Sequence, residues 1–157
     1  MVIDTSAVVA ILFGEPDQRR YDEAIAAAPV RLVSAVTRVE LAFVVEGRKR
    51  EEGRERLERF FWLTGADVVA VTPQQAEIAT AAFRRFGKGR HRAGLNIGDC
   101  FAYALAVASG LPLLFKGDDF VHTDVRAALP AQEHSSAASA ASTYLRARLS
   151  SAAPAGA

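Results

Sequence analysis

The chain has 157 residues, half of them apolar, and a formal net charge of +1. This length suits one domain with a single core, and the small net charge means that any nucleic-acid binding must depend on a local basic patch. One cysteine, Cys100, excludes an intramolecular disulfide and fits a reducing compartment. The sequence has no zinc-type His/Cys spacing, no membrane-spanning apolar run and no secretion signal, so we expect a cytoplasmic protein.

Short apolar runs alternate with segments of helical spacing along most of the chain. Buried strands are expected at residues 2–3, 31–34, 68–71 and 113–115. Helices are expected at residues 5–13, 17–28, 35–46, 51–63, 74–86 and 97–109, and the last of these is apolar on nearly every side. Strands that alternate with helices predict an α/β domain with a mainly parallel central sheet.

The composition changes after Pro130, because residues 131–157 are dominated by Ala and Ser. Such a segment has too few large apolar side chains to offset the entropy that is lost on ordering. We therefore expect one domain over residues 1–130 and a disordered C-terminal tail. Within the tail, residues 143–149 could form a short helix against a partner.

Several acidic residues follow expected strands or begin expected helices. Asp4 ends the first strand, and Asp118 and Asp119 follow the last one. Taken singly, Asp4 is a good helix cap and the Asp pair is ordinary turn chemistry. Asp99 stands three residues after Asn96, where an acid favours the helix dipole, yet the helix that it begins is otherwise apolar.

Glu40 lies on an apolar helical stripe with Val36 and Phe43. A carboxylate there loses hydration and needs a partner, although a Glu whose head reaches solvent is an equally good interpretation. The whole set is more informative, since ligand sites gather at the carboxyl ends of parallel strands. Carboxylates in a small volume repel each other unless a cation is present, and oxygen ligands suit Mg²⁺ or Mn²⁺. Such a metal activates water for phosphodiester hydrolysis.

Four segments, in order, resemble the motifs of PIN domains and of VapC toxins in particular. They are residues 1–7 (Met-Val-Ile-Asp-Thr-Ser-Ala), 39–41 (Val-Glu-Leu), 87–104 and 113–124. The resemblance covers residues 1 to about 130. It implies a PIN-like three-layer α/β/α fold and a Mg²⁺-dependent endoribonuclease that acts on RNA. It also implies a homodimer and neutralisation by a cognate VapB antitoxin.

The same resemblance implies site residues. Asp4 and Asp99 would be metal ligands, with Glu40 beside them. The fourth acid stays open between Asp118 and Asp119, because some relatives carry an acid at the position of Gly117.

A basic segment precedes the Asp99 helix and contains Arg84, Arg85, Lys88, Arg90, His91 and Arg92. Such a segment of basic residues usually forms a solvated loop. Because the segment leads directly into a candidate catalytic helix, we expect it to contact the RNA backbone, with Arg90 and Arg92 as the candidate binding residues.

Two other functions are compatible with parts of this pattern. A non-catalytic PIN-like protein would bind RNA or act as a scaffold, although such proteins lose acids that this chain keeps. An aspartyl phosphotransfer enzyme with Asp4 as nucleophile is disfavoured, because the second Asp expected two residues later is Ser6 here.

Overall fold

The computed structural model describes residues 1–130, so the tail expected to be disordered lies outside the described residues. These residues form four strands, five α-helices and one 3₁₀ helix. In chain order they are β1 (Val2–Ile3), α1 (Thr5–Leu12), α2 (Gln18–Ala27), β2 (Leu32–Ser34), α3 (Ala35–Thr64), β3 (Asp67–Val69), α4 (Pro73–Phe86), α5 (Ile97–Ser109), β4 (Leu113–Leu114) and η1 (Phe120–His122).

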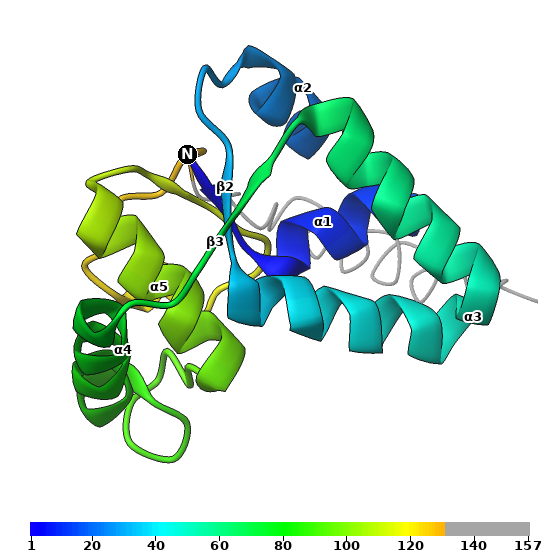
Figure 1. Ribbon diagram of the computed structural model, residues 1–157. Helices are drawn as coiled ribbons and strands as arrows, with labels where there is room; N and C mark the ends of the chain where they lie inside the picture. Colours follow the sequence, from blue (N-terminus) through cyan, green and yellow to red (C-terminus); the bar gives the residue numbers. More distant parts are fainter. Residues whose placement is uncertain (131–157) are drawn as a thin grey trace, which may run out of the picture.

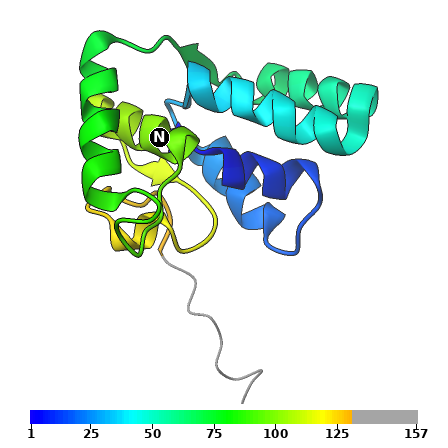
Figure 2. The same ribbon diagram turned by 90° about the horizontal axis from the view of Figure 1, so that it is seen from below.

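The strands form one parallel sheet in the order β3-β2-β1-β4. Side chains alternate between its faces, so Val2 and Leu113 pack with α4 and α5, whereas Ile3 and Leu114 pack with α1, α2 and α3. All four side chains are fully buried. Figures 1 and 2 show the helices on both sides of the sheet, which confirms the predicted three-layer α/β/α arrangement.

β3 differs from the buried strand that we expected. It lies at the edge of the sheet, covers residues 67–69 instead of 68–71, and leaves Val68 48% exposed. Apolar runs in sequence do not distinguish a central strand from an edge strand, because both favour β-branched residues. The other edge is partly covered, since Leu113 N–H donates to the Arg126 carbonyl and Ala128 N–H donates to the Leu113 carbonyl, both at 2.8 Å.

α3 contains the two helices that were expected at residues 35–46 and 51–63. The chain reverses at Arg50, which has φ 49° and ψ −126°, and the second half returns beside the first (Figure 1). Gly53 makes this close approach possible, because a Cβ there would lie 2.4 Å from the Val45 carbonyl oxygen. The buried face includes Leu41 and Val45, and the expected stripe is wrong, since Phe43 is 75% exposed.

α5 runs through the interior beside α4. Most of its apolar side chains are buried in the protein, and no helix within residues 1–130 is both long enough and apolar enough to cross a membrane. Asn96 caps its first turn, and Gly110 ends it with φ 66°. The first turn of α5 therefore lies at a defined place near the carboxyl ends of the central strands.

Candidate active site

Asp4 leaves β1 and caps α1, and its side chain is only 2% exposed. One carboxylate oxygen, Oδ2, accepts hydrogen bonds from the Ser6 N–H at 2.9 Å and from the Ser6 hydroxyl at 2.6 Å. The other oxygen, Oδ1, is buried and has no hydrogen-bond partner among residues 1–130. Burial raises the pKa of Asp4, the bonds from Ser6 oppose this, and the charge of Glu40 adds to it.

Asp99 lies in the first turn of α5 and is 9% exposed. It forms a capping box with Asn96, in which Asn96 N–H donates to Asp99 Oδ2 at 2.7 Å and Asp99 N–H donates to Asn96 Oδ1 at 3.0 Å. Burial raises the pKa of Asp99 to about 7, and the charges of Asp4, Glu40 and Asp119 add to this rise against the bond from Asn96. The fold therefore brings four of the predicted acids into one electrostatic neighbourhood.

Glu40 reaches this neighbourhood through two contacts. The Thr5 hydroxyl donates to Glu40 Oε2. On the other side the carboxylate rests against Gly98, where an added Cβ would lie 2.5–2.7 Å from three Glu40 atoms. Sequence reasoning missed Gly98; the available signal was a glycine inside the first turn of an apolar helix, where Ala is the better helix former.

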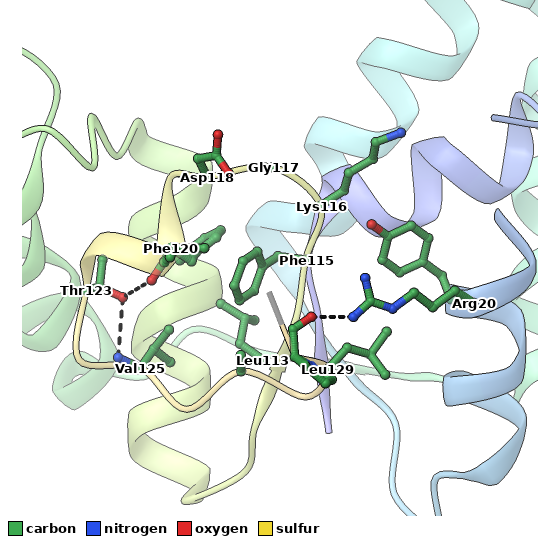
Figure 3. Close-up of a pocket in the computed structure, with 14 residues that line it drawn as sticks. Arg20, Leu113, Phe115, Lys116, Gly117, Asp118, Phe120, Thr123, Val125 and Leu129 are labelled. Carbon is green, nitrogen blue, oxygen red and sulfur yellow. Dashed lines mark hydrogen bonds between the residues drawn. The ribbon is translucent and has the colours of Figure 1, made fainter. Parts of the chain in front are cut away.

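Asp118 and Asp119 are both exposed but have different surroundings. The charge of Asp119 acts on Asp99. Asp118 instead lines a separate cavity of about 250 Å³ (Figure 3), to which Asp4, Glu40 and Asp99 do not contribute. This placement favours Asp119 over Asp118 as the fourth member of the acidic cluster, which from here on means Asp4, Glu40, Asp99 and Asp119.

The acidic cluster suits a hydrated divalent cation. Within the described residues no three His, Cys, Asp or Glu side chains already stand close enough together to enclose a metal ion. Mg²⁺, however, is usually held by one or two carboxylates and keeps several of its waters. Such a cation would give Asp4 Oδ1 a partner. It would also offset the repulsion between Asp99 and the neighbouring carboxylates.

Without metal, stability should fall as the pH rises through the range in which Asp99 titrates. The pKa of Asp99 rises from an ordinary 3.8 to about 7 on folding, so between these values the unfolded chain has lost a proton that the folded chain keeps. In EDTA, raising the pH from 5 to 8 should therefore lower the Tm of the wild type relative to that of Asp99→Asn. Parallel Tm curves for the two proteins would contradict the shifted pKa.

Comparison with known proteins identifies the family of this chain. The family model for the PIN domain matches residues 1–126. The chain is also 54% identical over 125 residues to the VapC ribonuclease Mb0640 of Mycobacterium bovis, a match that covers 80% of this chain and 95% of that protein. The chain belongs to the VapC family of PIN-domain proteins.

Two solved structures share the fold. Mycobacterium tuberculosis VapC20, described as a sarcin-ricin loop cleaving toxin, matches with a TM-score of 0.63 at 19% identity over 80% of this chain and 98% of that one. A toxin–antitoxin complex from Klebsiella pneumoniae matches with a TM-score of 0.58 at 21% identity, over 78% and 92% of the two chains. In the present chain, the acidic cluster lies where the parallel sheet and the first turn of α5 meet.

The basic segment of this VapC-family chain lies between α4 and α5. Arg90 and Arg92 are exposed, and neither pairs with an acid within residues 1–130. Arg90 stacks over the Phe83 ring at 5.3 Å from its centroid. Arg85, by contrast, pairs with Asp124. The two candidate RNA-binding arginines therefore keep their charges available at the surface.

Proposed function

We propose that this protein is a Mg²⁺-dependent endoribonuclease, with Mn²⁺ as an alternative metal, and the toxin of a VapBC-type pair. The observation that carries the proposal is the buried, unpartnered Asp4 Oδ1 in a cluster whose charges raise the pKa of Asp99. The VapC relative that is 54% identical is named a ribonuclease, which supports the same activity here.

In this proposal Asp4 and Asp99 hold the metal, and Glu40 and Asp119 contribute charge beside it. The bound ion would orient and activate a water and neutralise charge on the scissile phosphate. Ser6 keeps Asp4 Oδ2 occupied, which leaves Oδ1 as the carboxylate oxygen without a partner within residues 1–130 and so as the oxygen that would bind the metal. The capping box fixes Asp99 at the start of α5, and burial limits the number of waters that compete for both carboxylates.

Cleavage by purified protein tests the proposal. Single-stranded RNA should be cut in Mg²⁺ or Mn²⁺, left intact in EDTA, and cut again when metal is restored. Binding of RNA without cleavage under all three conditions would instead support the non-catalytic alternative. Mapping of new 5′ ends after expression in cells would then identify the RNA and the site that is cut.

The proposal includes two protein partners, a VapB-like antitoxin and a second copy of this chain. The toxin–antitoxin complex among the structural neighbours supports the first. Large apolar side chains are exposed in the described part of the single chain, notably Phe43 at 75%, Trp62 at 81% and Ile97 at 73%. Surfaces of this kind commonly mark contacts with other proteins. Light scattering of the purified toxin, alone and with antitoxin, would measure both associations.

Substitution of the two exposed arginines should weaken RNA binding in a salt-dependent way. If Arg90 and Arg92 contact phosphates, each Arg→Ala change should flatten the slope of log affinity against log salt by about 0.7 for a single strand. Binding is measured in Ca²⁺ to limit cleavage, and the loss should be similar for unrelated RNA sequences. Arg19, which pairs with Glu23 on α2, provides a control in Arg19→Ala. An unchanged slope in the double Arg90/Arg92 variant would show that the segment is only a solvated surface.

A further inference from the structure

A partly buried ion cluster joins the loop after β4 to the loop between α1 and α2. The Lys116 ammonium lies 2.8 Å from Asp17 Oδ1 and also donates to Glu15 Oε2. The Asp17 side chain is 16% exposed, and its other oxygen accepts a bond of 3.2 Å from the hydroxyl of the buried Tyr21. Hydrogen bonds to Asp17 and Glu15 raise the pKa of Lys116. The ammonium is thus held by two carboxylates from a different part of the chain.

The backbone of the same residue reaches the acidic cluster. Lys116 N–H donates to Ser6 Oγ at 2.9 Å, and the Ser6 hydroxyl donates to Asp4 Oδ2 at 2.6 Å. A serine hydroxyl has one proton, and accepting the amide's bond directs that proton to Asp4. This relay keeps Oδ2 occupied, while Oδ1 has no partner within residues 1–130.

The loop beyond Lys116 leads to the other end of the acidic cluster. Gly117 has φ 95°, a left-handed conformation that lets the chain turn directly after the lysine. Figure 3 shows the side chains of Lys116 and Asp118 leaving the loop in different directions. Asp119 follows, and its charge acts on Asp99. The loop that begins at Lys116 therefore contacts Ser6, which orients Asp4, and then leads to Asp119, the fourth acid of the cluster.

We propose that Lys116 is a positioning residue for the acidic cluster. Its ammonium, clamped by Glu15 and Asp17, holds a loop whose backbone orients Asp4 through Ser6 and carries Asp119. Within residues 1–130 the ammonium pairs with Glu15 and Asp17 of the α1–α2 loop and with no carboxylate of the acidic cluster, so its effect on the cluster passes through the loop. This inference rests on the proposed function, since the cluster matters here as a metal site.

A charge effect and a positioning effect predict opposite changes in metal affinity when this lysine is removed. Loss of a positive charge near several carboxylates should strengthen the binding of a divalent cation. Loss of positioning should weaken it, because groups that orient metal ligands commonly contribute 10–100-fold in metal affinity. The direction of the change therefore distinguishes a positioning role from a simple charge effect.

The test is a calorimetric titration of the full-length protein with Mn²⁺ in the absence of RNA. Lys116→Met should bind Mn²⁺ about tenfold more weakly than wild type. Lys116→Arg, which keeps a cation for both carboxylates, should restore most of the affinity. Arg19→Met removes an exposed ion pair on α2, with side chains 88% and 65% exposed, and should bind Mn²⁺ as wild type does.

Three outcomes decide the inference. Binding by Lys116→Met that equals or exceeds wild type overturns the inference and leaves the proposed function standing. Weakened binding that Lys116→Arg does not restore also overturns it, because the clamp would then not be the cause. Absence of Mn²⁺ binding by wild type overturns the proposed function itself, and the inference with it. Circular-dichroism melts in EDTA check folding. Lys116→Gln, which removes the charge that both carboxylates hold, replaces any unfolded Met variant and should also weaken Mn²⁺ binding.

Discussion

Asp99→Asn should lower the rate of RNA cleavage by at least about a hundredfold while the fold stays intact. The substitution removes the negative charge that the proposed metal site needs but keeps the shape of the side chain. The amide oxygen can still accept the bond from Asn96 N–H, so the cap of α5 survives. Repulsion from Asp4 and Glu40 is relieved at the same time. The variant should therefore melt at an equal or higher temperature than wild type in EDTA.

Two neighbouring acids provide the matched comparison for this experiment. Asp119→Asn should reduce cleavage, because the charge of Asp119 acts on Asp99, whereas Asp118→Asn should retain nearly wild-type cleavage, because Asp118 lines the separate cavity. Initial rates at several Mg²⁺ concentrations measure all three variants. Full activity in Asp99→Asn would remove the acidic cluster from the mechanism. The reverse order of the two loop variants would move the fourth acid to Asp118.

The layers of the fold could be predicted from sequence because they depend on local patterns. Alternation in β1 and β4 places successive side chains on opposite faces, and a cap followed by helical spacing predicts α5. The two halves of α3 were also expected as helices, but their return at Arg50 was not. That reversal depends on the close approach at Gly53, a tertiary contact without a periodic signal.

The candidate site was predictable only in part, for a similar reason. Acids at strand ends converge in any parallel sheet, so Asp4 could be grouped with the Asp118–Asp119 pair before the fold was known, while the choice between the two stayed open. Glu40 was chosen for an apolar stripe that proves to be exposed at Phe43, and its half-buried carboxylate instead contacts Thr5 and Gly98. Such contacts join residues far apart in the chain, and residue type alone does not encode them.

Gly98→Ala should fold normally and lose cleavage by about tenfold or more. The new Cβ would lie 2.5–2.7 Å from the Glu40 carboxylate, which is the end of a flexible side chain and can turn away more easily than α5 can move. Within a helix, Ala is also favoured over Gly by about 1 kcal/mol. Stability in EDTA should therefore be unchanged or higher, while Glu40 is displaced from Asp99. Melting curves and cleavage rates on the same samples measure the two effects separately.

A second glycine and a double variant isolate the cause. Gly47 lies in α3 with no atom within 4 Å of an added Cβ, so Gly47→Ala should gain helix stability and keep full cleavage. In a Glu40→Ala background, Gly98→Ala should cause no further loss of cleavage, because the group that it displaces is already absent. A further loss in the double variant would mean that Gly98 acts on Asp99 directly. Full cleavage by the single Gly98→Ala protein would show that the position of Glu40 beside α5 is not needed for the reaction.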